Sequence, residues 1–197
     1  MRPRERTLIL VIGLVALGGC ERQGGSNEEL GDRPEQTVAR ACRDVDPARM
    51  PDASGPRPRN GYTPLAERDS LLRAIEAGEQ KWRASRPAGY SITVVASCFC
   101  RDRGLPVVLS VHGDSVVASR DTTWQQTWPD DWRTGLHVAG LFREARQFAC
   151  DSTRTTRVTM DRRLGYPRVL ATESRLEVSD AQREYRVLSF AAEGSER

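Results

Sequence analysis

The chain has 197 residues and a formal net charge of +3, and 38% of its residues are hydrophobic. This length is enough for one domain with a substantial buried core. Positive and negative charges are mixed along the chain, so the composition excludes a charged tail of the kind that binds nucleic acid. We therefore expect a single globular domain and no nucleic-acid partner.

The amino terminus has the three parts of an export signal. Arg2, Arg4 and Arg6 precede an uncharged apolar run at 8–19. As a helix this run would rise only about 18 Å, which is short of the ~30 Å hydrocarbon core of a bilayer. A basic start, a short apolar run and small residues before a cleavage point are typical of a signal peptide, so residues 1–19 are predicted to be removed.

The end of this signal, LGGC at Leu17–Cys20, resembles the bacterial lipobox of an aliphatic residue, two small residues and a cysteine. The resemblance implies cleavage before Cys20, a diacylglyceryl group on its thiol and a further acyl chain, such as palmitate, on its amino group. Two or three such acyl chains are enough to hold a protein stably in a membrane. We expect a cell-envelope lipoprotein, held by lipid on the outer face of the plasma membrane or in the outer membrane. The alternative is a plain signal followed by an incidental cysteine.

Residues 20–61 are polar and rich in Pro and Gly, which predicts a tether between the membrane and the domain. Within it, the stretch 36–44 contains Val38 and Cys42 and is the part predicted to dock on the domain as a short helix. A cysteine in a free tether would be an unpaired thiol, so we expect Cys42 to fasten this stretch.

Residues 62–197 are predicted to form the globular domain. Apolar residues at helical spacing follow Thr63, which can cap a helix, and Pro64, which suits its first position. The stretch 90–100 instead alternates as a strand does. In chain order we expect a helix at 63–84, strands at 90–100 and on both sides of a turn at Gly113–Asp114, a helix at 137–149, and strands at 157–161, 167–172 and 184–191.

The connections between these elements are short, and short connections favour antiparallel pairing. The order is helix, three strands, helix, three strands. It predicts an α+β fold with a single antiparallel sheet of about five to six strands and two helices on one face.

Four cysteines remain besides Cys20, and an oxidising envelope predicts that they form two disulfides. Residues i and i+2 of a regular strand lie about 6.6 Å apart, at the outer limit for a bridge. The favoured pairing therefore joins Cys98 and Cys100, one each, to Cys150 and Cys42. The alternative pairs Cys98 with Cys100 and Cys42 with Cys150.

Two chemical interpretations of Cys98 and Cys100 have less support. A zinc site would need further ligands, such as Cys150 and His112, and reduced thiols that an oxidising compartment disfavours. A redox centre would favour a C-x-x-C pair opening a helix, whereas this pair ends an apolar strand where burial raises the thiol pKa. Hence we predict no metal and no cofactor.

No catalytic constellation is predicted either. His112, Asp114 and Ser115 surround one tight turn, where adjacent side chains point apart, so a turn explains them better than a Ser–His–Asp set. His137 opens a helix and is interpreted as a surface or capping residue. Asp130–Asp131 are interpreted as a solvated turn rather than a carboxylate pair or a calcium site.

The best candidate ligand surface is rich in tryptophan. Three of the four tryptophans of the chain, Trp124, Trp128 and Trp132, recur every four residues in a polar segment. Aromatic side chains in exposed loops can bind a glycan or an envelope protein. The alternative is that they cover the open end of the sheet or pack on the second helix.

Several short motifs occur in a fixed order along residues 80–190. They are Trp82 at a helix end, Tyr90 opening a strand, CFC at 98–100, VVLSVHGDSVV at 107–117, GLF at 140–142, LGYP at 164–167 and EYRVLSF at 184–190. In this order they resemble the bacterial domain of unknown function 6174, which is common in lipoproteins and exported proteins. The resemblance implies a fold and no particular chemistry.

Together these patterns predict an envelope-anchored lipoprotein that acts as a non-catalytic binding or interaction module. One alternative is an envelope enzyme or a thiol-redox protein that uses Cys98 and Cys100. Another is a purely structural assembly module.

Overall fold

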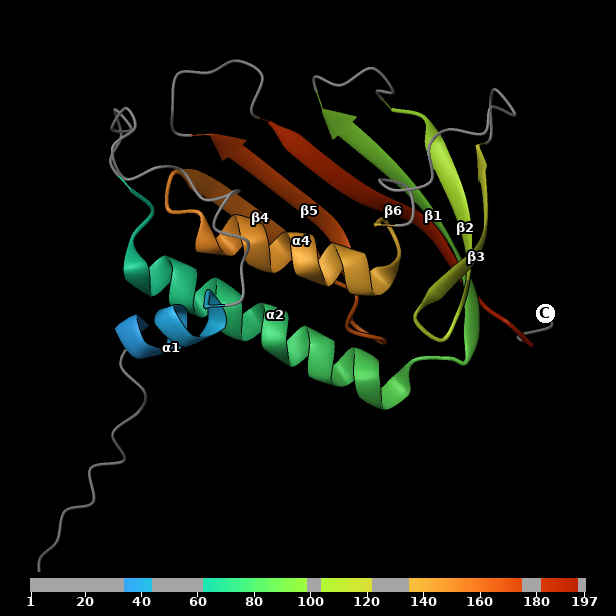
Figure 1. The fold of residues 1–197 in the computed structure, drawn as a ribbon, viewed down its shortest axis with the longest axis horizontal. Coiled ribbons are helices and arrows are strands. Elements are labelled where there is room, and N and C mark those ends of the chain that lie inside the picture. The colour runs from blue at the N-terminus through green and yellow to red at the C-terminus, as the bar shows by residue number, and fades with distance from the viewer. Residues whose placement is uncertain (1–33, 44–61, 99–103, 122–134, 175–181, 195–197) are drawn as a thin grey trace, which may run out of the picture. The chain divides into compact units, whose positions relative to one another are not determined.

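The computed structural model describes residues 34–43, 62–98, 104–121, 135–174 and 182–194, and these ranges hold three helices and six strands (Figure 1). The helices are α1 (Pro34–Ala41), α2 (Leu65–Ser85) and α4 (Val138–Cys150). The strands are β1 (Gly89–Cys98), β2 (Pro106–His112), β3 (Ser115–Asp121), β4 (Arg154–Met160), β5 (Pro167–Ser174) and β6 (Arg183–Ala192).

The described strands form one sheet in the order β3-β2-β1-β6-β5-β4, and every neighbouring pair is antiparallel. Two groups of three consecutive strands are therefore joined at the centre by β1 and β6. Both α2 and α4 lie on the same face of this sheet (Figure 1). The predicted α+β fold, with one antiparallel sheet and two helices on one face, is confirmed.

Alternation along the central strand decides which side chains face the helices. Ile92 and Val94 of β1 are fully buried, whereas Ser97 is exposed. Residues on the buried side of α2 and α4 complete the core: Leu72, Ile75, Val138, Leu141, Phe142 and Ala145. The hydrophobic core therefore lies between the sheet and these two helices.

An aromatic cluster fixes the carboxyl end of α2 to the sheet. The indole ring of Trp82 meets the rings of Tyr90, Tyr166 and Phe190 edge-on, with centroid separations of 5.4, 6.0 and 5.8 Å. The hydroxyl of Tyr90 accepts a hydrogen bond from the backbone N–H of Val138, 3.3 Å away, and burial raises the pKa of Tyr90 to about 12. The cluster therefore joins α2, β1, β6 and the start of α4.

Two glycines allow α2 to contact the turn between β4 and β5. Gly165 has a positive φ of 82°, and a Cβ atom there would lie 2.5 Å from the carbonyl oxygen of Gly78. A Cβ atom on Gly78 would lie 2.8 Å from the carbonyl oxygen of Gly165. The two backbones therefore approach more closely than any side chain would permit.

We predict that Gly165→Ala destabilises the fold far more than Gly113→Ala. Gly113 also has a positive φ, of 60°, but a Cβ atom there would meet nothing within 4 Å. Gly113→Ala should cost about 1–2 kcal/mol for its backbone conformation alone. Gly165→Ala should cost at least about 2 kcal/mol more, because the overlap separates α2 from the turn. Denaturant unfolding checks this difference, and equal losses would show that the close contact is unimportant.

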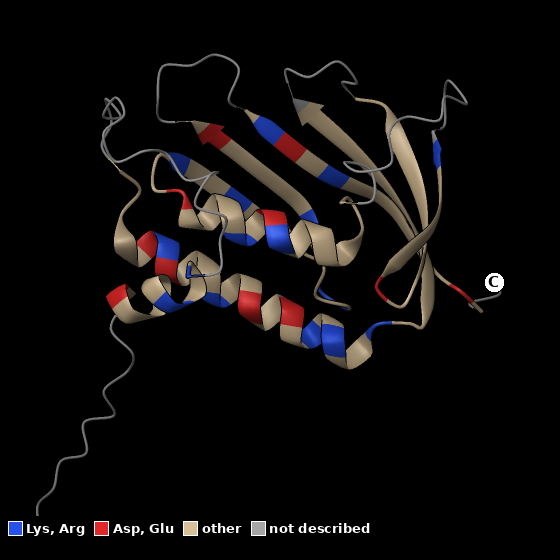
Figure 2. Ribbon diagram, viewed as in Figure 1, with Lys and Arg blue, Asp and Glu red and all other residues tan. Residues whose placement is uncertain are grey.

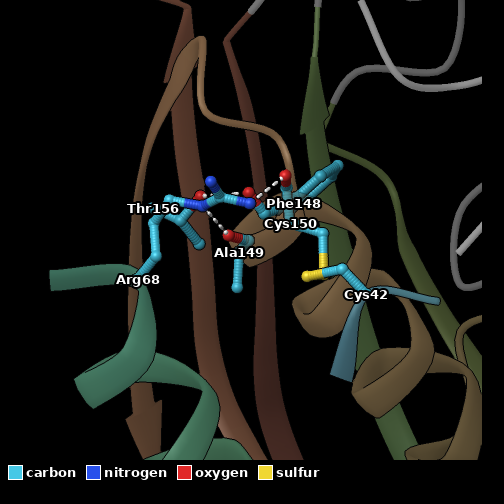
Figure 3. Close-up of a disulfide and its surroundings, with 6 residues drawn as sticks. All are labelled: Cys42, Arg68, Phe148, Ala149, Cys150 and Thr156. Atoms are coloured by element: carbon cyan, nitrogen blue, oxygen red, sulfur yellow. Dashed lines mark hydrogen bonds between the residues drawn. A yellow bond between two sulfur atoms is a disulfide. The ribbon is translucent and has the colours of Figure 1, made fainter. Parts of the chain in front are cut away.

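A disulfide joins Cys42 to Cys150, with an S–S distance of 2.01 Å and Cα atoms 5.5 Å apart (Figure 3). The favoured pairing of Cys42 with Cys98 or Cys100 is therefore wrong, and its alternative gives the correct partner. The helix α1 contacts both α2 and α4, and this brings Cys42 to the last residue of α4. The docking of α1 decides the partner.

The last turn of α4 is held from a second side by Arg68 of α2. The guanidinium of Arg68 donates hydrogen bonds to the carbonyl oxygens of Ala149 (3.1 Å) and Cys150 (2.6 Å), as Figure 3 shows. Thr63 was predicted to cap α2 and makes no such bond. Its hydroxyl donates instead to the carbonyl oxygen of Arg154, 2.6 Å away, because the start of α2 packs on the turn after α4.

We predict that Cys42→Ala combined with Cys150→Ala lowers the free energy of unfolding by about 2–4 kcal/mol, because the bridge closes a long loop in the unfolded chain. The sequence separation is 108 residues. Limited proteolysis should then cut α1 before the sheet opens. Val38→Ala, with the bridge intact, is the control: it removes a buried contact of α1 and should leave α1 protected. Unchanged stability and unchanged cleavage in the double variant would contradict this role.

Candidate functional site

An open cavity of about 570 Å³ lies beside the carboxyl-terminal half of α4. Its walls come from Gly135 and Leu136 just before α4, from α4 itself, from the turn into β4 and from the first residues of β6. Figure 1 shows that the start of β6 extends past α4, so this end of the sheet is not covered by the helix. The cavity occupies this uncovered part of the face that carries the core.

The wall on α4 consists of polar residues that flank its buried stripe. Arg143, Glu144 and Gln147 line the cavity, and Phe148, which is only 5% exposed, forms its base. Helical spacing sets Arg143 and Gln147 one turn apart on the same side. The side of α4 that does not contact the sheet thus presents a charged and hydrogen-bonding surface to the cavity.

The wall on β6 follows from strand alternation. Arg183, Tyr185 and Val187 share one side of the strand, and Val187 is buried in the core. Arg183, the first residue of β6, precedes Tyr185 by two residues. Its side chain is exposed and lines the cavity. A guanidinium therefore occupies the core-facing side of the strand at the point where the core ends. Figure 2 shows basic and acidic positions near the start of β6.

Asp151 and Arg154 form an internally compensated pair at the floor of the cavity. The Nε of Arg154 lies 2.9 Å from Oδ2 of Asp151, while Oδ1 accepts hydrogen bonds from the backbone N–H (2.9 Å) and hydroxyl (2.6 Å) of Thr153. Both oxygens of this carboxylate are therefore occupied by described partners. The negative charge of Asp151 is therefore paired with Arg154 and not with Arg143 or Arg183.

Aromatic rings support that pair. The guanidinium carbon of Arg154 lies 5.9 Å from the ring centroid of Phe148, and the rings of Phe148 and Tyr185 stack at 6.3 Å with an interplanar angle of 13°. Arg154, Phe148 and Tyr185 therefore connect β4, α4 and β6 across the cavity. Three elements share one packed wall, which keeps the positions of its polar groups fixed.

Arg143 and Arg183 differ from Arg154 in their surroundings. Neither guanidinium makes an ion pair with a residue in the described part of the chain. The side chains around the cavity comprise three arginines and two carboxylates, and one carboxylate is saturated by Arg154 and Thr153. The described side chains that line the cavity therefore carry one more positive than negative formal charge.

The predicted tryptophan surface and some of the other candidates lie outside the described residues. These are Cys20, Cys100, Trp124, Trp128, Trp132 and Asp130–Asp131. Cys98 is the last residue of β1 and pairs in register with Arg183. Cys150 is bonded to Cys42, which removes it from the set of zinc ligands considered above. Among the described residues no group of three potential metal ligands occurs.

His112 and Asp114, on either side of Gly113, contact different parts of the chain. Asp114 pairs with Arg86 of the loop after α2, and His112 has its Nδ1 3.8 Å from a carboxylate oxygen of Glu193. The two residues therefore contact different partners, as a turn predicts. His137 precedes the first residue of α4 and its side chain makes no capping hydrogen bond there.

Sequence reasoning missed the cavity. One signal was available: in REYRV at 183–187 a charged residue occupies the same side of the strand as Tyr185 and the buried Val187. A charge on the core-facing side indicates a place where the core ends. Arg143 gives no comparable signal, since arginine on the outer side of a helix is ordinary.

The family model of DUF6174, a family of unknown function, matches residues 74–192. The chain belongs to this family. The DUF6174 segment begins within α2 and ends with β6, so it contains all six strands, the aromatic cluster, both glycines of the close contact and the cavity. Cys42 and α1 lie before it. No curated protein matches the chain. None of the described helices is long and apolar enough to cross a bilayer.

Proposed function

We propose that this DUF6174 protein is a lipid-anchored, non-catalytic binding protein whose ligand occupies the cavity between α4 and β6. The observation that carries the proposal is the convergence of polar groups from α4, the turn into β4 and β6 on one hollow of about 570 Å³. Ligand sites are typically hollows of this size with a few fixed polar groups.

The composition of the walls favours binding over catalysis. The described residues that line the cavity include arginines, carboxylates, a glutamine and two aromatic rings, and they include no serine, cysteine, histidine or lysine. Nucleophilic catalysis uses one of those four side chains in most cases, next to a base. The groups present can orient and hold a molecule by hydrogen bonds and charge.

The anchor is argued from the sequence LGGC at Leu17–Cys20. We predict that the mature protein begins at an acylated Cys20 and that Cys20→Ser leaves an unlipidated precursor at full length. Cys98→Ser is the matched cysteine change and should leave lipidation and cleavage intact. Intact-mass measurement of protein from the membrane fraction decides the matter. An unmodified Cys20, or cleavage at another bond, would contradict the anchor.

The cavity is tested by filling it. Gln147 lies at the cavity on α4, and Gln80 is exposed on α2 away from it. We predict that a small molecule co-purifies with the unaltered protein and with Gln80→Trp. It should be absent from Gln147→Trp, because only that indole occupies the hollow. Mass spectrometry of small molecules released from each purified variant checks this. Circular dichroism confirms that each variant is folded. The same co-purifying molecules in both variants, or none with the unaltered protein, would contradict the proposal.

A further inference from the structure

We infer that the cavity selects an oxyanion, a carboxylate or phosphate group, held by Arg143 of α4 and Arg183 of β6. This inference rests on the proposed function and adds the class of ligand. Both arginines line the same hollow but come from elements far apart in sequence, so the fold alone brings them together.

Charge at the cavity favours an anion. Arg154 is neutralised by Asp151, whereas Arg143 and Arg183 form no ion pair with described residues. Two guanidinium groups that line the same hollow repel each other, and an oxyanion bound between them offsets that repulsion. A hollow bounded by packed protein also concentrates the field of its charges more than a flat surface does.

The alternative, a cation, fits the walls less well. Asp151 is one of the two carboxylates at the cavity, and its oxygens already accept hydrogen bonds from Thr153 and Arg154. Glu144 is the other and it contacts a partner of its own. A divalent cation needs several oxygen ligands, and the described walls do not supply them.

Arginine is the side chain best suited to this role. Its planar guanidinium donates two parallel hydrogen bonds to a carboxylate or phosphate, which adds geometry to charge. Because the two guanidinium groups come from different elements, α4 and β6, they would orient the ligand as well as attract it. Tyr185 and Phe148 form the stacked wall beside it, against which an apolar part of the ligand can lie.

The oxyanion can come from a free molecule or from a phospholipid headgroup, since both offer the same phosphate oxygens. The test therefore uses phenyl phosphate and inorganic phosphate as free probes, and vesicles with or without phosphatidylglycerol as the lipid probe. Benzyl alcohol is the neutral probe of similar shape. The protein is residues 20–197, produced without the signal segment 1–19 and with Cys20→Ser, so that neither its own lipid nor the apolar signal carries it to the vesicles.

Binding is measured from the shifts of the backbone amides of Leu136 and Gln147 in nuclear magnetic resonance spectra. We expect phenyl phosphate at about 10 mM or below to shift both amides saturably. The dissociation constant should rise at least about tenfold in Arg143→Gln/Arg183→Gln, which corresponds to 1.4 kcal/mol. Arg120→Gln, a charge-matched change on β3, should leave it unchanged. Added salt should weaken binding by the unaltered protein.

The double variant Arg143→Lys/Arg183→Lys keeps both positive charges but lacks the paired N–H donors of the guanidinium. Its dissociation constant for phenyl phosphate should lie between those of the unaltered protein and the double glutamine variant. Thermal melting confirms that the variants are folded. Free phenyl phosphate that binds while phosphatidylglycerol vesicles do not would assign a soluble ligand, and the reverse would assign a headgroup.

The inference is overturned if phenyl phosphate and the vesicles leave both amides unshifted, or if the double glutamine variant binds them as tightly as the unaltered protein. If benzyl alcohol shifts the same amides and Gln147→Trp abolishes that effect, the cavity binds ligands without selecting an anion. The proposed function would then stand while this inference fails. If Gln147→Trp leaves the binding of every probe unchanged, the cavity is not the site and both fail.

Discussion

The pairing of β1 with β6 is the constraint on which the rest of the structure depends. It extends from Tyr90 opposite Ala192 to Cys98 opposite Arg183 and joins the two groups of three strands. At one end it brings Tyr90 and Phe190 together under Trp82. At the other end it carries Arg183 past α4 to the cavity. The aromatic cluster and the candidate site thus lie at opposite ends of the same strand pair, and loss of this pairing would remove both.

Local pattern was enough to predict the elements and the fold class. Alternation in YSITVVAS and helical spacing in LLRAIEAG are local signals, and the structure confirms both. The position of β6 beside β1 could not be predicted in the same way, because many pairings of short antiparallel strands satisfy the same alternation. The cavity depends on that pairing and on the length of α4 relative to β6, so it became visible only with the tertiary structure.

The cysteines show why a local distance argument can fail. Two residues apart on a regular strand, Cys98 and Cys100 would be awkward partners. Cys98 is the last described residue of β1, and Cys100 lies outside the described residues. The decisive fact is instead the docking of α1, which brings Cys42 to the end of α4 and occupies Cys150. Of the pairings considered from the sequence, the one that remains joins Cys98 to Cys100, and it stays a prediction.

The disulfide and the cavity meet in the last turn of α4. Cys42 holds this turn through Cys150, and Arg68 holds it through the carbonyl oxygens of Ala149 and Cys150. Phe148 in the same turn forms the base of the cavity, and Asp151 follows directly. A helix end frays unless its carbonyl groups have partners. The segment before the family domain, which carries Cys42, therefore stabilises one wall of the candidate site.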